Sequence, residues 1–212
     1  MERNSVIKSV ISVMAQLAFL PVFAHYDSDM EGNVMVEWGM NTSFFNHRLY
    51  SGIENEYHPG LHVAFGHVTD YVLKVDKKIF FDSYDSSCQW YIGNAKKSVI
   101  AKEIRTGFQM DFGYPLGFGK YGTFYATLGI RFSVVMGNMK YDVSESTQLM
   151  NLKRCRFDTP FTIQYLYDYS FFVSCGINRE LGNSLSRESR KDLDGRLKFY
   201  SPFICIGYYF EF

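Results

Sequence analysis

Strict alternation of apolar and mixed residues is the feature that most constrains this chain. From Phe124 to Met136, seven consecutive alternate positions are apolar, and the positions between them hold Tyr, Thr, Gly, Arg, Ser and Val. Side chains along a β-strand point to opposite faces of the sheet in turn, so this run builds one wholly apolar face and one mixed face. A run of this length at period two predicts a β-strand.

The same alternation recurs along the chain and predicts eight strands in all. It is clearest in the middle of the chain, at 100–114 and 122–136, and weaker at 70–81. The predicted strands occupy residues 33–45, 60–67, 70–81, 100–114, 122–136, 160–167, 171–178 and 203–212. Long polar connections are expected at 46–57, 82–98, 138–157 and 181–196. They alternate with short turns, so an up-and-down sheet would gather the long connections at one end and the short turns at the other.

The first 24 residues have the organisation of a secretory signal. Arg3 and Lys8 precede an apolar stretch that ends at Leu20, and Val22-Phe23-Ala24 supplies the residues that a signal peptidase reads. We expect cleavage after Ala24, which leaves residues 25–212 as one domain. A short buried helix is the alternative interpretation of this segment.

Composition excludes several classes of protein. The 22 basic and 22 acidic residues cancel and form no basic block, so no nucleic-acid partner is expected. Mean hydropathy is −0.14, which excludes a bundle of membrane-spanning helices. No phosphate-binding loop, dinucleotide-binding glycine pattern, HExxH or CxxC motif is present, so no cofactor and no metal are expected.

Alternation alone does not say which face lies inside a closed sheet. A soluble lipocalin-like carrier is apolar inside and polar outside, whereas a membrane barrel has the opposite arrangement. Three features favour the membrane: charges on the mixed faces, alternating connection lengths, and apolar faces unbroken over the roughly 9–11 residues that a tilted strand needs to cross a bilayer. We therefore predict an all-β chain that forms an eight-stranded antiparallel up-and-down transmembrane β-barrel.

The mixed faces place a cluster of charged residues inside this predicted barrel. Its members are Glu37, Glu103, Arg105, Asp111 and Arg131. An Arg facing lipid would cost about 2–4 kcal/mol at the bilayer centre, whereas opposite charges can pair inside the barrel. Eight strands enclose a space that side chains can fill, so a general diffusion pore is not expected. His62 shares the inward face and is expected to hydrogen-bond an interior carboxylate.

The chain resembles the small outer-membrane β-barrel proteins of Gram-negative bacteria, the porin-family or OmpA/OmpX-like barrels. The resemblance covers about residues 33–212 and depends on the signal, the alternating strands and the C-terminal GYYFEF. In that family the last strand commonly ends in Phe after alternate apolar residues, and the barrel-assembly machinery reads this end. The residues that match are Ile206, Tyr208, Phe210 and Phe212.

The resemblance also implies a location and a role. It implies a monomer in the outer membrane, in contact with outer-membrane lipids, without a cofactor, and with external loops as the contact surface. Some barrels of this kind instead modify lipid A and use His with Ser or Asp on the outer side. His47, Ser51 and His58 lie in the first long connection, but their spacing matches no nucleophile motif, so no enzymatic activity is expected.

Cysteine positions leave one question open. Cys175 is expected to face lipid and Cys205 the interior, so these two should not pair. Cys88 and Cys155 fall in two different long connections. An exported chain meets an oxidising compartment, so both a disulfide and two free thiols are compatible with the sequence.

Overall fold

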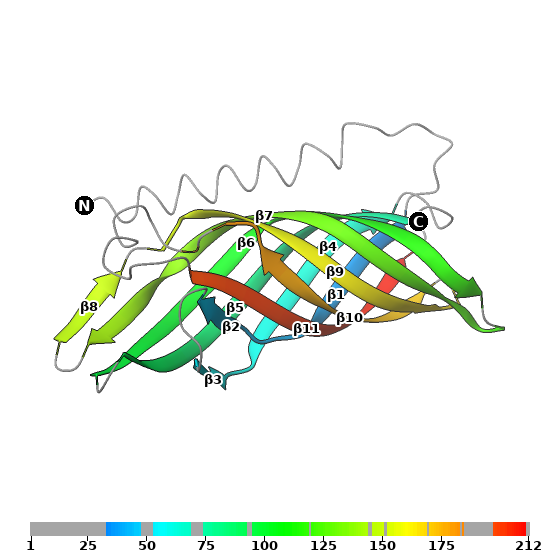
Figure 1. Cartoon of the computed structure of the whole chain (residues 1–212). Helices are drawn as coiled ribbons and strands as arrows, with labels where there is room; N and C mark the ends of the chain where they lie inside the picture. Colours follow the sequence, from blue (N-terminus) through cyan, green and yellow to red (C-terminus); the bar gives the residue numbers. More distant parts are fainter. Residues whose placement is uncertain are drawn as a thin grey trace, which may run out of the picture.

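Backbone hydrogen bonds close the chain into a ring of eight antiparallel strands in the computed structural model (Figure 1). The ring strands are Asn33–Asn41 (β1), Gly60–Val68 (β4), Lys74–Ile92 (β5), Ala95–Phe118 (β6), Gly122–Val143 (β7), Cys155–Tyr167 (β9), Phe171–Glu180 (β10) and Leu197–Phe210 (β11). They follow one another around the ring in chain order, and β1 pairs with β11 to close it. The predicted eight-stranded up-and-down barrel is therefore confirmed.

The structure describes most of the chain from Asn33 onward. The described residues are 33–47, 53–68, 74–92, 95–118, 120–143, 146–150, 152–168, 170–182, 184 and 197–210. The predicted signal at 1–24, together with Ser51 and Phe212, lies outside them. Within the described residues there is no helix long and apolar enough to cross a bilayer.

Three short strands lengthen the sheet at one end of the barrel. Phe44–His47 (β2) pairs with β11, Glu54–Tyr57 (β3) with β5, and Ser146–Met150 (β8) with β7. We call this end, which also holds the turn between β5 and β6, the extended end; β3 and β8 mark it in Figure 1. The opposite end, where residues 119–121 and 168–170 connect neighbouring strands, is the short-turn end.

The predicted long connection at 82–98 is wrong. β5 continues to Ile92, β6 begins at Ala95, and the two strands stay in register along this whole length. β7 likewise continues to Val143, so much of the predicted connection at 138–157 is also strand. The outward residues of these extensions are mostly polar, so the sequence there lacks the apolar alternation that identifies a lipid-facing strand.

Amide exchange tests these strand extensions. We expect the segment Ser83–Cys88 to exchange slowly in the folded barrel in detergent, because alternate residues donate their amides to β6 and Ser86–Cys88 are also paired with β3. Hydrogen–deuterium exchange followed by mass spectrometry measures this, with the urea-unfolded chain as the fast-exchanging control. Exchange of residues 83–88 in the folded barrel as fast as in the unfolded chain would show that they form a loop.

Candidate functional site: the wall and interior of the barrel

The outward face of the wall is apolar through the middle of the barrel. Every ring strand contributes exposed large apolar side chains to this band, which we call the belt. Examples, one from each ring strand, are Trp38, Phe65, Phe81, Phe112, Ile130, Phe161, Val173 and Ile206. Soluble monomers rarely expose so extensive an apolar surface. Lys77 is a charged exception near the start of β5, where its long stem lets the ammonium reach the interface.

The polarity of the wall reverses toward the extended end. Outward positions there are mostly polar, and they include Ser83, Asp85, Ser87, Gln89, Ser98, Lys102, Asn138 and Lys140. Inward positions become apolar and form a buried cluster that includes Phe45, Cys88, Trp90, Val99, Ala101, Met139, Tyr141 and Phe199. This part of the barrel therefore has the polarity of a soluble protein: its outside suits water and its inside is an apolar core.

The reversal occurs at one level on neighbouring strands. Ile104 of β6 is paired with Met136 of β7, and both are exposed apolar residues of the belt. Two positions further along, Lys102 is paired with Asn138, and both are exposed and polar. A change from apolar to polar at matched positions marks the level at which the wall leaves hydrocarbon and enters water.

Charged side chains fill the interior at the level of the belt. Near the short-turn end, Lys78 donates a hydrogen bond to Glu37 at 2.7 Å and lies 3.3 Å from a carboxylate oxygen of Asp111. The Lys78–Glu37 pair joins β5 to β1, which is not its neighbour in the ring, whereas Asp111 lies on the neighbouring strand β6. All three are buried.

Asp82 is the centre of the next layer of the interior. It accepts a hydrogen bond from Tyr84 at 2.7 Å and also bonds Nδ1 of His62 and the guanidinium of Arg131. The guanidinium carbon of Arg131 lies 3.4 Å from the ring centre of Phe80. The inward carboxylate expected as a partner of His62 is thus Asp82.

A group of two arginines and two glutamates lies beyond Asp82, toward the extended end. Glu103 lies 3.1 Å from Arg105 and 3.1 Å from Arg156, and all three side chains are buried. Arg156 also lies 3.6 Å from Glu180. The guanidinium of Arg156 is 4.8 Å from the Phe199 ring, where the ionic interior meets the apolar cluster of the extended end.

Apolar layers close the ionic interior at both ends. At the short-turn end the buried layer consists of Met35, Val68, Tyr125, Leu166, Phe172 and Tyr209. At the extended end it is the cluster that contains Trp90 and Tyr141, whose rings stack at 6.1 Å. In the described part of the chain, the lumen is therefore filled by packed side chains and does not form an open diffusion pore.

All five residues of the predicted interior cluster lie on the inward face and are buried. The structure does not join them into one cluster: Glu37 and Asp111 share Lys78, Glu103 pairs with Arg105, and Arg131 pairs with Asp82. The sequence reasoning missed Asp82 and Arg156, which pair with the cluster. Asp82 begins a segment expected to be a loop, and Arg156 lies in another, so no strand register was available to assign them a face.

The C-terminal strand presents its predicted assembly residues outward. Ile206, Tyr208 and Phe210 are exposed on β11, and the rings of Tyr208 and Phe210 lie 4.9 Å apart. On the inward face, Tyr209 packs against Phe172. These positions belong to the belt.

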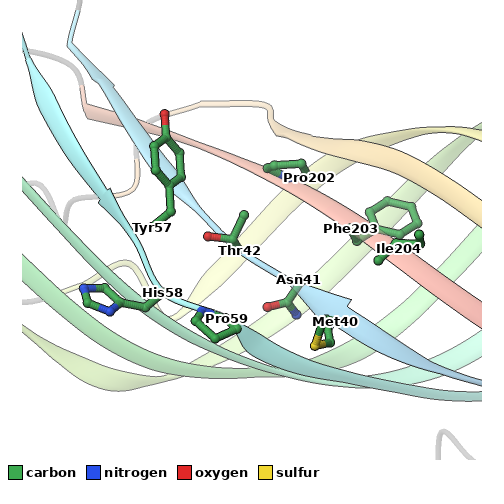
Figure 2. Close-up of a pocket in the computed structure, with 9 residues that line it drawn as sticks. All are labelled: Met40, Asn41, Thr42, Tyr57, His58, Pro59, Pro202, Phe203 and Ile204. Atoms are coloured by element: carbon green, nitrogen blue, oxygen red, sulfur yellow. The ribbon is translucent and has the colours of Figure 1, made fainter.

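A groove follows a break in the wall near the extended end. The ladder between β1 and β4 stops where β1 ends at Asn41 and β4 begins at Gly60. Beyond this point β2 and β3 are joined by a side chain: Oδ1 of Asn55 accepts from the backbone N–H of Phe45 at 2.8 Å, and Nδ2 of Asn55 donates to the Phe45 carbonyl at 3.2 Å. Figure 2 shows the groove, of about 360 Å³. Its lining consists of Met40, Asn41, Thr42, Tyr57, His58, Pro59, Pro202, Phe203 and Ile204.

The candidate catalytic residues are not brought together by the described part of the structure. His58 is exposed at the groove, and its Nε2 lies 3.7 Å from a carboxylate oxygen of Glu56. His47 is paired through its backbone with Leu197, and Ser51 lies outside the described residues.

The four cysteines are free thiols in the structure. Cys88 points into the apolar cluster of the extended end, whereas Cys155 is exposed on the outward face, so these two do not bridge. Burial raises the pKa of the Cys88 thiol to about 12. Cys175 is exposed and Cys205 is buried, as the register of their strands predicts.

Comparisons with known proteins give fold likenesses alone. No family model matches the chain, and no curated protein matches it by sequence. Among solved structures, Ail of Yersinia pestis in complex with sucrose octasulfate is 12% identical over 85% of this chain and 100% of its own, with a TM-score of 0.46. OprG of Pseudomonas aeruginosa is 10% identical over 86% and 98%, with a TM-score of 0.46. The N-terminal β-barrel domain of OprF from the same organism is 13% identical over 84% and 99%, with a TM-score of 0.40. At these scores no role passes from those proteins to this chain.

The fold and its polarity define the class of the protein. A closed ring pairs the backbone groups of its strands without an edge, which hydrocarbon requires. The belt faces outward and the ion pairs face inward, which is the polarity of a barrel in a bilayer. The chain is a transmembrane β-barrel.

Two substitutions on one face of β7 test the level of the bilayer. Ile130→Lys places a charge in the belt and should lower the free energy of unfolding in lipid vesicles by about 2–4 kcal/mol. Asn138→Lys, eight residues along the same outward face, should change it by less than about 1 kcal/mol because that position faces water. Equal costs for the two variants, measured by urea unfolding, would refute the assigned boundary.

A second pair of variants tests the buried charges. Arg131→Met leaves Asp82 without its cation in a buried site and should destabilise the barrel by about 3–5 kcal/mol. The matched control is Lys102→Met, which breaks an exposed ion pair with Asp85 at 3.0 Å and should cost about 0–1 kcal/mol. The same urea unfolding assay measures both, and a small loss for Arg131→Met would mean that the Arg131–Asp82 pair does not stabilise the interior.

Proposed function

We propose that this chain is an outer-membrane β-barrel with a structural and contact role in the cell envelope. The observation that carries the proposal is the reversal of wall polarity between Met136 and Asn138, because it divides the barrel into a part suited to lipid and a part suited to water. The interior is filled by side chains, which supports a structural role in preference to the passage of solutes through the barrel.

The extended end is the contact surface in this proposal, and it faces the outside of the cell. The outward residues of β3, β5, β6 and β7 at this end project into water on strands, which hold them more rigidly than loops would. The face is divided by charge. Glu54 and Glu56 of β3 are exposed on one part, and Lys96, Lys102, Lys140, Lys153 and Arg154 are exposed on another.

The short-turn end faces the periplasm in this proposal. Export by the segment 1–24, with cleavage after Ala24, would deliver the chain to that side. The barrel-assembly machinery would then recognise Ile206, Tyr208, Phe210 and Phe212 on the last strand, and the folded barrel would be a monomer among outer-membrane lipids. The short connections between β6 and β7 and between β9 and β10 support this orientation, because short turns lie on the periplasmic side of such barrels.

The alternatives have less support from the geometry. A soluble carrier would have to expose the belt to water, and the lumen that would hold its ligand is filled with ion pairs. A lipid A-modifying enzyme would need a His–Ser or His–Asp arrangement at the extended end, and His58 is instead beside Glu56. Unchanged lipid A in a deletion strain would be the expected result.

Labelling of intact cells tests location and orientation together. In a chain whose natural cysteines are replaced by Ser, Lys102→Cys should react with a membrane-impermeant maleimide on intact cells. Lys120→Cys, exposed at the short-turn end, should react only after the outer membrane is permeabilised. Labelling of Lys120→Cys alone on intact cells would reverse the orientation, and labelling of neither variant, with the chain in the soluble fraction, would reject the proposal.

A further inference from the structure

A row of three residues crosses the inward face where the ring closes. Gly39 of β1 is paired with His62 of β4 on one side and with Cys205 of β11 on the other. Gly39 has no side chain, and a Cβ atom built there would lie only 2.8 Å from Sγ of Cys205. The missing side chain therefore leaves a space across which the imidazole and the thiol approach each other.

Glu37 completes this group from the same strand. It lies two residues before Gly39, so its side chain points to the same inward face. One donor atom from each of Glu37, His62 and Cys205 lies within 4.8 Å of the others, and all three residues are buried. A tetrahedral zinc ion holds such donors about 3.3–3.7 Å apart, so modest side-chain rotations bring them into place.

His62 presents an unused nitrogen to this group. Its Nδ1 is bonded to Asp82, while its Nε2 is buried without a hydrogen-bond partner, and Oε1 of Glu37 lies 3.9 Å away. Metal-binding histidines typically give one nitrogen to the metal and the other to a carboxylate, which fixes the ring. Asp82 is the carboxylate that bonds the other nitrogen of His62, and the guanidinium of Arg131 in turn pairs with Asp82.

We propose that Glu37, His62 and Cys205 bind one Zn²⁺ inside the barrel, with the fourth position open to water. Imidazole, thiolate and carboxylate are ligands that zinc accepts together. Binding transfers the thiol proton of Cys205 to water, and the thiolate and the Glu37 carboxylate then balance the two charges of the ion. The other oxygen of Glu37 keeps its bond to Lys78, and Ser174 donates to Oε1 at 3.3 Å.

The apolar layers at the extended end and at the short-turn end enclose the proposed site, and this enclosure indicates at what stage of folding the ion enters. A site enclosed at both ends exchanges slowly with solvent, so loading accompanies closure of β1 against β11. The ligands come from the first, second and last strands of the ring, so the ion would link the two edges that close the barrel. Bound zinc therefore stabilises the closure directly.

Metal content and cobalt absorption test the site. The chain is refolded into detergent in the presence of Zn²⁺ or Co²⁺, desalted, and checked for folding by its migration before and after boiling. We expect about one zinc per folded chain, and a thiolate-to-cobalt charge-transfer band in the near ultraviolet. Folded wild-type barrel that holds neither zinc nor the cobalt band would overturn the proposal.

Cysteine variants distinguish this site from adventitious binding. Cys205→Ser should remove the band and lower zinc to below about a tenth per chain, while the triple variant Cys88→Ser/Cys155→Ser/Cys175→Ser should retain both. His62→Asn keeps a donor for Asp82 but lacks the ring nitrogen and should also lose the metal. If folded Cys205→Ser binds as much zinc as the wild type, the ligands lie elsewhere and the proposal is wrong. If Cys205→Ser does not fold, Glu37→Gln supplies the same test.

Discussion

Pairing of β1 with β11 is the contact on which the rest of this structure depends. Hydrocarbon offers no partner for a backbone amide or carbonyl, so a sheet can cross a bilayer only when its two edges join. Eight residues of each strand are in register at this closure, from Val34 with Phe210 to Asn41 with Phe203. Once the ring is closed, the pleat gives every strand one face to lipid and one to the lumen. The outward apolar belt and the enclosed charges follow from that single geometric condition.

The closed ring also explains why so many charges can be buried. An isolated ion in a low-dielectric interior is costly, and a buried pair is stable only when its geometry is good and its remaining hydrogen bonds are satisfied. Here the partners come from different strands: Glu37 from β1 meets Lys78 from β5, and Asp82 from β5 meets Arg131 from β7. Each pair fixes the distance between strands that are not neighbours in the ring. The ionic interior thus holds the barrel in shape across its lumen, as an apolar core does in a soluble domain.

The reversal of polarity along β5, β6 and β7 shows that a single strand can face lipid over one part of its length and water over the next. Within the belt these strands place Phe81 and Ile130 in lipid; beyond it they place Trp90 and Met139 inside and Asp85 and Lys140 in water. The extended end therefore has the polarity of a soluble barrel, and the rest has the polarity of a membrane barrel. The backbone ladders between β5, β6 and β7 continue through both parts. A rigid outer surface of this kind suits the contact role proposed above. The proposed zinc site lies on the short-turn side of the polarity reversal, within the part of the barrel that the belt surrounds, where β1 pairs with β11.

Period-two alternation in the sequence determined the strand class, the ring of eight, and which residues face lipid, because a pleated strand converts spacing directly into faces. It placed Arg131 and Glu37 inward and Cys175 outward without any knowledge of partners. It failed at residues 82–98, because a strand in water has polar outward residues and its composition resembles a loop. Only the tertiary structure decided that Asp82 holds both Arg131 and His62, and that His62 meets Cys205 across Gly39. The Asp82 contacts join residues 20 and 49 positions apart in the chain, and His62 and Cys205 lie on the second and last strands of the ring. All of them depend on how the strands pair around the ring, which local spacing does not encode.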